Sequence, residues 1–134
     1  MDAEIIAALS KKTAYDHNIT EPIRTKSTHI STIFLTGKYA YKIKKSVAFD
    51  FLDFTSLEKR HHYCMQELTL NRRFSPEIYL DVVPICTTPS GQIKVGKSHE
   101  DDTIIEWAGN TKRKMFIDTI KAPIFLYNFC YKLI

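Results

Sequence analysis

Residues 30–44 read ISTIFLTGKYAYKIK, and this stretch decides the fold. Two runs of β-branched and aromatic residues, 30–35 and 39–44, flank a three-residue connection that contains Gly37. Gly37 supplies the positive φ that a tight turn between antiparallel strands requires. Every second side chain of the second run shares one face of a strand. One such face is predicted to carry Ala40, Lys42 and Lys44. The stretch therefore predicts a β-hairpin with one apolar face and one face that bears two lysines.

The segments around the hairpin complete a pattern of helices and strands. Thr55 followed by Glu58 is typical of a capping box, and it predicts a long helix from Ser56 to about Phe74. The side chains expected along its buried stripe are Leu57, His61, Cys64 and Leu68. The other predicted elements are a helix over residues 2–12, strands over 23–28, 78–86, 92–95 and 103–108, and an aromatic-rich connection over 46–54 that packs on the sheet.

The order of these elements indicates the fold class. A helix and two or three strands come first, followed by one long helix and three more strands. The chain has no internal repeat and no alternation of strands with helices, so a parallel sheet is not expected. The predicted fold is α+β, with an antiparallel β-sheet of about five strands and one long crossing helix.

Composition limits the class of protein. A chain of 134 residues, 44% hydrophobic and 25% charged, has the composition of a globular domain and excludes wholesale disorder. The net charge of +4 permits an anionic partner without requiring one. Three widely spaced cysteines do not indicate a disulfide framework, and the first residues do not read as a signal peptide. We therefore expect a cytoplasmic protein that has no membrane association.

Three features in chain order indicate a nucleotide site. Residues 39–42 read YAYK, an apolar–Ala–apolar–Lys run that matches the kinase V-A-I-K signature. Glu67 follows Lys42 by 25 positions (67 − 42 = 25) in the predicted long helix, where a kinase places the carboxylate that holds its lysine. Residues 105–109 follow a predicted buried strand, as the adenine-reading hinge of a kinase does. Alone, the lysines are typical of a solvated strand edge, and it is the shared order that favours a site.

The sequence also resembles a known family. Over residues 28–85 it is similar to the kinase-like half of bacterial aminoglycoside phosphotransferase-like proteins, in whose longer members a P-loop ATP-binding half follows. The motifs that carry the resemblance are YAYKIKK at 39–45, FLDF at 51–54, LEKR at 57–60 and LNRR at 70–73. The resemblance is strong from about Leu9 to Ile85 and weaker to Phe116. It implies the fold of a protein-kinase-like N-terminal lobe, with ATP as the nucleotide and with Mg²⁺ only if a C-terminal lobe is supplied.

On the phosphate side, the resemblance assigns Lys42 to the nucleotide phosphates and Glu67 to positioning that lysine. Lys44 competes for the phosphate role because it lies on the same face one pleat further along. The segment Thr28–Ser31 stands where a kinase has its phosphate-covering loop, although it contains no glycine. Ser31 and the backbone amides of this segment are therefore expected to donate to phosphate.

On the adenine side, small Ala40 would let a flat base approach the sheet. The resemblance assigns the backbone carbonyl of Glu106 and the backbone amide of Ala108 to the adenine edge, with Ile105 behind the base. The implied partner of this site is a nucleotide.

The residues after the expected hinge lack the groups for catalysis. Residues 110–134 hold one acid, Asp118, and contain no H-x-D or D-F-G-like element. We expect residues 1–116 to form a lobe that does not catalyse phosphoryl transfer alone. Residues 117–134 are expected to be an apolar tail, off the family pattern, in a truncated chain. A missing C-terminal lobe, or self-association through this tail, is the further partner expected.

The sequence also bears on a metal site, a nucleic-acid site and a role without nucleotide. The His61–Cys64 segment lacks the paired short spacings of a zinc site, so no metal site is expected. The basic residues near Arg72 have no interleaved aromatic residues or RNA-binding signature, so nucleic acid is not an expected partner. The alternative function is a small α+β protein-interaction module that retains the lobe fold and does not bind nucleotide.

Overall fold

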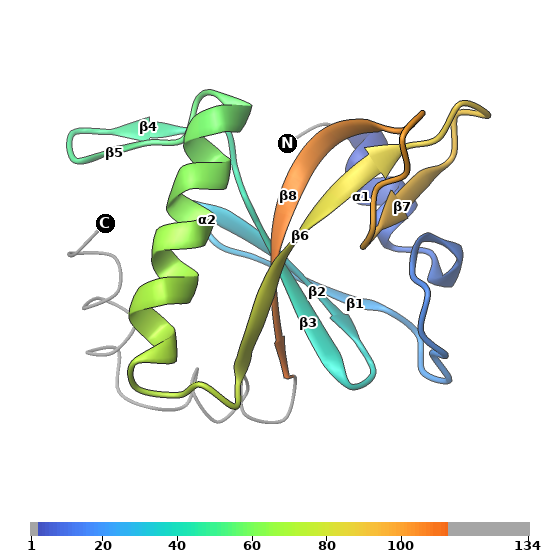
Figure 1. Ribbon diagram of the computed structural model, residues 1–134, viewed down its shortest axis with the longest axis horizontal. Coiled ribbons are helices and arrows are strands. Elements are labelled where there is room, and N and C mark those ends of the chain that lie inside the picture. Colours follow the sequence, from blue (N-terminus) through green and yellow to red (C-terminus); the bar gives the residue numbers. More distant parts are fainter. Residues whose placement is uncertain (1–2, 113–134) are drawn as a thin grey trace.

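The computed structural model describes residues 3–112 of the chain. The predicted domain boundary after residue 116 and the apolar tail lie outside the described residues. Figure 1 shows an α+β fold in which a curled antiparallel sheet is flanked by helices. The strands of the six-stranded sheet, in spatial order, are β1 (Arg24–Ser27), β2 (Ser31–Thr36), β3 (Tyr39–Lys44), β8 (Thr103–Lys112), β6 (Tyr79–Thr87) and β7 (Ile93–Val95). The α+β class is confirmed, and the sheet has one strand more than expected.

The predicted hairpin is confirmed in its register and in its turn. Strands β2 and β3 pair from Thr36 opposite Tyr39 to Ser31 opposite Lys44. Gly37 has a φ of 78°, a conformation that a residue with a Cβ rarely adopts. Alternation along β3 then separates two environments, because successive side chains point to opposite faces of the sheet.

The first of these environments is the main hydrophobic core. The helix α1 (Ala3–Leu9) and the 3₁₀ turn η1 (Lys12–Ala14) cover this face of the sheet. The buried core residues on the sheet side include Phe34, Tyr41, Ile43, Ile85 and Ala108, and those from the N-terminal segment include Ile5, Leu9, Ala14 and Tyr15. This packing leaves the opposite face of β3 for the helix α2.

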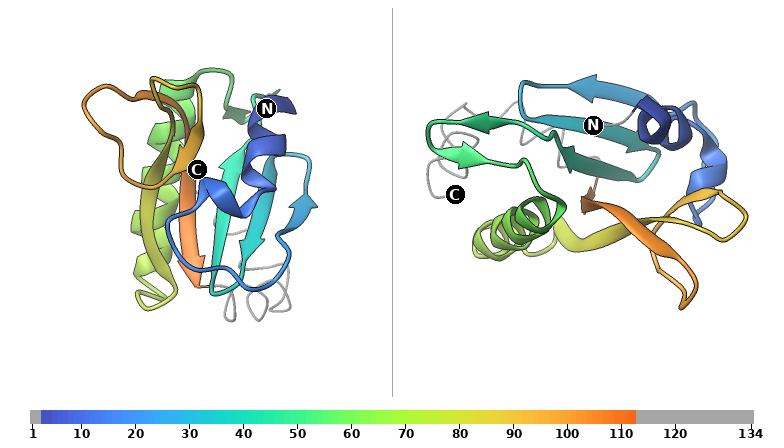
Figure 2. Two further views of the ribbon diagram at one scale, coloured as in Figure 1. Left: turned by 90° about the vertical axis from the view of Figure 1, so that its right-hand side faces the viewer. Right: turned by 90° about the horizontal axis from the view of Figure 1, so that it is seen from above.

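The helix α2 (Leu57–Arg72) packs beside β6 and β8 on the opposite face from α1. Figure 2 shows α1 and α2 on the two sides of the sheet. The predicted N-cap, Thr55, is wrong by one residue. Ser56 caps the helix by accepting a hydrogen bond from the backbone amide of Lys59 at 3.1 Å. The Thr55 hydroxyl donates instead to the Asp53 carboxylate at 2.6 Å, so it is engaged outside the helix.

The connection over residues 46–54 differs from the prediction that it packs on the sheet. It forms a separate hairpin of β4 (Ala48–Phe49) and β5 (Leu52–Asp53). Its inner end is anchored, since Leu52 and Phe54 are buried. Its outer end is not, since the side chains of Phe49 and Phe51 are 48% and 73% exposed. The aromatic residues of this segment therefore divide between an anchor and an exposed tip.

Candidate functional site

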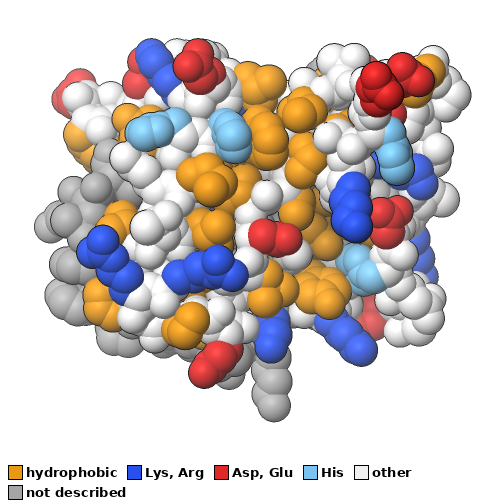
Figure 3. Space-filling view, in the orientation of Figure 1, with side chains coloured by type: hydrophobic (Ala, Val, Ile, Leu, Met, Phe, Trp, Pro, Cys, Tyr) orange, Lys and Arg blue, Asp and Glu red, His pale blue; other side chains and the backbone are white. Residues whose placement is uncertain are grey.

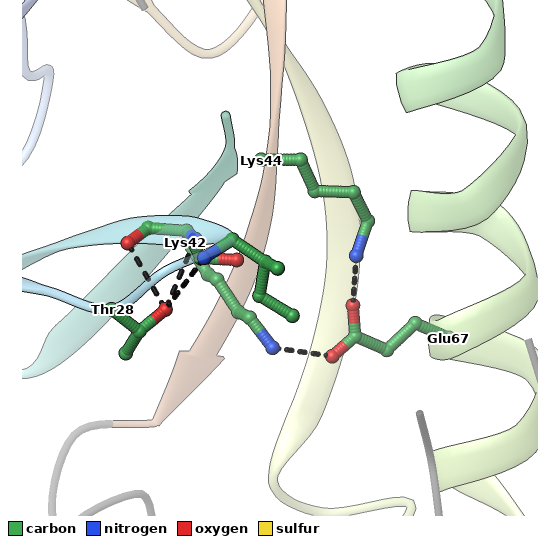
Figure 4. Close-up of polar contacts among 6 residues, drawn as sticks. Thr28, Lys42, Lys44 and Glu67 are labelled. Atoms are coloured by element: carbon green, nitrogen blue, oxygen red, sulfur yellow. Dashed lines mark hydrogen bonds and ion pairs between the residues drawn. The ribbon is translucent and has the colours of Figure 1, made fainter. Parts of the chain in front are cut away.

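The site is a junction between β3 and α2 where two lysines meet one glutamate. The Lys42 Nζ donates to the Glu67 Oε1 at 2.7 Å, and the Lys44 Nζ donates to the Glu67 Oε2 at 2.8 Å. Figure 4 shows both lysines extending from β3 toward the helix. The side chain of Lys44 is 1% exposed, whereas Lys42 and Glu67 are 13% and 15% exposed. The expected Lys42–Glu67 contact therefore forms, and Lys44 shares it.

The side of α2 that faces the sheet is polar. Arg60, Cys64, Glu67 and Asn71 follow one another at helical spacings of four, three and four residues, which places them on one stripe. Cys64 and Asn71 are buried, while the predicted apolar members Leu57 and Leu68 are only partly buried. A helix that presents charged groups to the interior does not gain the burial energy of an apolar stripe. This stripe therefore departs from the usual apolar packing of a helix on a sheet.

Arg60 makes the second ion pair of this stripe. Its Nε donates to the Glu106 Oε1 on β8 at 3.1 Å, and its Nη1 donates to the backbone carbonyl of Phe54 at 2.8 Å. The side chains of Arg60 and Glu106 are 12% and 5% exposed. The predicted sites did not include Arg60. Arg60 precedes Glu67 by seven residues (67 − 60 = 7), or two helical turns, and this spacing indicates that both side chains lie on one side of the helix.

The electrostatics of the cluster favour an ionised carboxylate. Burial alone would raise the pKa of Glu67, but the charges of Lys42 and Lys44 and their hydrogen bonds outweigh burial and lower that pKa to about 2. Burial raises the pKa of the Cys64 thiol to about 11, although Lys44 opposes this effect. Among the described residues, the Glu67 carboxylate is thus shared by two lysines, one on each of its oxygens.

The sheet beside the cluster is lined by small and apolar side chains. Ala40 is buried together with Ile33 and Leu35. Gly109 lies directly opposite Lys42, and Thr111 lies directly opposite Ala40, so both share this face of the sheet. The structure therefore brings Ala40 and Lys42 onto one face, as expected, and adds two β8 residues whose relation to β3 was not predicted.

The segment Thr28–Ser31 is closed by its own hydrogen bonds. The backbone amide of Ser31 donates to the Thr28 Oγ1 at 3.0 Å, and that of Ile30 donates to the same atom at 3.4 Å (Figure 4). The expectation that these two amides are available to a phosphate is therefore wrong. The Ser31 side chain is fully buried opposite Lys44, and within the described residues its hydroxyl has no hydrogen-bond partner.

The predicted hinge over residues 105–109 is wrong because this segment lies inside β8 and does not follow a strand. Ala108 pairs with Ile43 of β3 on one side and with Val83 of β6 on the other. In an antiparallel strand the amide and carbonyl of a residue point to the same neighbour, so those of Ala108 are used within the sheet. Ala108 and Ile105 pack toward the core under α1, and Glu106 binds Arg60.

Within residues 3–112, no group of three or more His, Cys, Asp or Glu side chains is arranged to hold a metal ion. No helix in the same part of the chain is long and apolar enough to cross a membrane.

The fold and the site define an α+β domain with a buried lysine–glutamate–lysine cluster between a strand and a helix. No model of a known protein family matches the chain, and no solved structure matches it. Over 77 residues it is 39% identical to uncharacterized protein Rv2004c of Mycobacterium tuberculosis and to uncharacterized protein Mb2027c of Mycobacterium bovis. The match covers 56% of this chain and 15% of each relative. The chain therefore spans only a small part of the length of the curated relatives it matches.

Proposed function

We propose that the domain is the nucleotide-binding N-terminal lobe of a kinase-like, ATP-dependent phosphotransferase, related to the aminoglycoside phosphotransferase-like proteins. The observation that carries the proposal is the 2.7 Å contact between the Lys42 ammonium and the Glu67 carboxylate, which joins a central strand to the long helix. A kinase uses such a pair to hold its lysine against the α- and β-phosphates of ATP.

The topology around the pair supports the proposal. The lysine lies on the second strand of a hairpin, the glutamate lies on the helix that follows, and β8 returns beside the lysine strand. On the same face, small Ala40 and Thr111 lie opposite one another on neighbouring strands, next to Lys42. In this proposal the adenine lies against Ala40 and the phosphates lie at Lys42, whose side chain is the more exposed of the two lysines.

The proposal assigns binding, and not catalysis, to these residues. A kinase requires an aspartate base and an aspartate that binds Mg²⁺, and both belong to a second lobe. In such an enzyme the nucleotide lies between two lobes, so one lobe alone supplies part of the contact surface. We therefore expect weak binding of ATP by this chain, with a Kd on the order of millimolar, or ~4 kcal/mol.

The test is an NMR titration of the chain with Mg-ATP, followed through backbone amides of β3 and β8. Lys42→Ala should weaken binding several-fold. Lys38→Ala, in the exposed turn of the same hairpin, changes the net charge equally and should leave the affinity unchanged. The proposal is wrong if ATP shifts no resonance near Lys42, or if both variants bind as the parent chain does.

A second candidate function is a protein-interaction module, and the β4–β5 hairpin favours it. Phe49 and Phe51 are both exposed at the hairpin tip, which is typical of a docking element because large apolar side chains are usually covered. Figure 3 shows further hydrophobic side chains between α2 and the strands β6 and β8. Self-association of the chain that Phe49→Ser and Phe51→Ser abolish, together with no affinity for ATP, would favour this function over nucleotide binding.

A further inference from the structure

Thr111 on β8 carries a buried hydroxyl that the described part of the chain does not use. The residue is 7% exposed, and within the described residues its Oγ1 has no hydrogen-bond partner. Thr36, a buried threonine of the same sheet, shows the usual arrangement, because its hydroxyl donates to the backbone carbonyl of Tyr39 at 3.3 Å. A buried hydroxyl that stays unpaired lowers the stability of a fold. The Thr111 hydroxyl therefore does not stabilise the domain.

The neighbours of Thr111 toward β2 are apolar. Ala40 lies directly opposite Thr111 on β3, and Leu35 lies opposite Ala40 on β2. Both neighbours are buried, at 1% and 3% exposure. A valine at position 111 would have nearly the same shape as threonine and would match this row without leaving a hydroxyl unpaired. Packing alone therefore does not explain a threonine at this position.

The position of Thr111 beside the lysine strand suggests a use for the hydroxyl. Gly109 precedes Thr111 by two residues on β8 and lies directly opposite Lys42, so Thr111–Ala40 and Gly109–Lys42 form two adjacent rows on one face of the sheet. Such rows lie about 7 Å apart along the strands, a separation that a ribose bridges between a base and its phosphates. One row carries the ammonium group and the other carries the hydroxyl beside a methyl group.

We propose that the Thr111 hydroxyl hydrogen-bonds to the polar edge of the adenine in a bound nucleotide, which makes Thr111 a base-reading residue of the site. This inference rests on the proposed function, in which the phosphates lie at Lys42 and the base lies against Ala40. A hydroxyl both donates and accepts, so it matches either kind of polar group on the base. Because the row is buried, the base takes the place of its present cover, and a hydrogen bond formed there is stronger than one formed in water.

The first part of the test measures the stability of the chain without nucleotide. Thr111→Val removes the hydroxyl at nearly constant shape and should raise the urea midpoint of unfolding, since no hydrogen bond is lost. Thr36→Val is the matched control, because it removes a buried hydroxyl that is bonded, and it should lower that midpoint. A lower midpoint for Thr111→Val would show that the hydroxyl serves the fold, and the proposal would be wrong.

The second part measures affinity for Mg-ATP and for inorganic triphosphate by NMR titration. Thr111→Val should weaken ATP binding about three- to tenfold, the effect of one neutral hydrogen bond, and should leave triphosphate binding unchanged. Thr111→Ser keeps a hydroxyl and should bind ATP more tightly than Thr111→Val does. Thr36→Val should bind both ligands as the parent chain does. An equal loss for the two ligands, or no loss for ATP, would contradict a contact with the base.

The third part uses the parent chain, so it does not depend on the folding of a variant. With carbon-13-labelled threonine methyl groups and bound Mg-ATP, a nuclear Overhauser effect should connect the Thr111 methyl group to the H2 or H8 proton of adenine. An effect confined to the ribose protons would overturn the assignment of this residue to the base.

The outcomes separate the two proposals. If neither ATP nor triphosphate binds the parent chain, the proposed function fails and the role of Thr111 fails with it. If Lys42→Ala weakens ATP binding whereas Thr111→Val does not, the proposed function stands and only the role given to Thr111 is wrong.

Discussion

Acid should destabilise this domain in part through Glu67, and Glu67→Gln isolates that contribution. The pKa of Glu67 is lowered from 4.5 to about 2 in the folded chain. A lowered pKa adds stability that is complete above the unfolded-state value of 4.5 and is lost as the pH falls through 2. The difference of 2.5 units (4.5 − 2) corresponds to roughly 3 kcal/mol of unfolding free energy, lost between about pH 5 and pH 2.

The Gln variant lacks this dependence because its amide does not ionise. At pH 7 it leaves two ammonium groups without their carboxylate, and breaking a buried ion pair costs about 3–5 kcal/mol. Near pH 2 the protonated carboxyl resembles the amide, so the stabilities of the two proteins should converge. Urea unfolding between pH 7 and pH 2, followed by circular dichroism and by the fluorescence of Trp107, measures the difference at each pH.

Glu58→Gln, on the exposed first turn of the same helix, is the matched control. It should change the unfolding free energy by no more than about 0.5 kcal/mol at any pH. The reasoning is refuted if the parent chain and Glu67→Gln differ by a constant amount across the whole pH range, since the Glu67 carboxylate would then carry no shifted pKa.

Two further predictions concern an ion pair of α2 and two buried cysteines. Arg60→Leu should lower the free energy of unfolding by about 3 kcal/mol, because it leaves the buried Glu106 carboxylate without its ion-pair partner. Adding Glu106→Leu should recover most of that loss, as measured by urea unfolding. A double variant less stable than the single one would contradict this. The residues Cys64 and Cys86 are 4% and 1% exposed, and burial raises the pKa of both thiols. Neither should react with iodoacetamide at pH 8 until the chain is unfolded. Peptide mass spectrometry of a Cys130→Ser chain, labelled with and without urea, checks this, and fast native labelling of Cys64 would show that the α2–sheet junction opens.

The sequence predicted those parts of the fold that local chemistry determines. The alternation over residues 39–44 and the glycine at position 37 gave the hairpin, its turn and the face that carries Lys42. The order of that strand and the helix that follows gave the contact with Glu67. The hairpin depends on short-range periodicity, which tertiary packing did not override, whereas the contact with Glu67 was predicted from the kinase-like order of the two residues.

Strand β8 shows where local reasoning failed. The strand was predicted to end at Ala108, and residues 105–109 were interpreted as a hinge; Gly109 and Asn110 are also residue types that favour turns. In the folded chain they continue β8, since the strand lies between β3 and β6 and both neighbours pair with it beyond Ala108. Pairing on two sides outweighs a weak local preference, and the sequence alone does not show which strands will be neighbours.

Two members of the polar stripe of α2, Arg60 and Asn71, were not predicted, for a different reason. Apolar periodicity locates the buried side of a helix only when that side is apolar, and the buried side of α2 carries Arg60, Cys64, Glu67 and Asn71. The prediction for Phe49 and Phe51 was wrong in the opposite sense: these aromatic residues were expected to pack on the sheet, and they are exposed. At both places the sequence departs from the usual rule that apolar residues are inside, and such departures are expected at functional sites.

This departure bears on the choice between the two candidate functions. A well-packed apolar contact commonly stabilises a fold as much as a buried ion pair, or more. An interaction module that needed α2 only as a structural support would therefore be at least as stable with apolar residues in place of the buried charges. The cluster instead keeps three ionisable groups in a layer of the fold where each must be desolvated. Such an arrangement is costly for support alone, yet it suits a site that presents Lys42 to an anionic ligand. The exposed hairpin at Phe49 and Phe51 involves none of these three groups, so docking there would leave the charges of the cluster unexplained. The buried cluster therefore supports nucleotide binding over a purely structural role for α2.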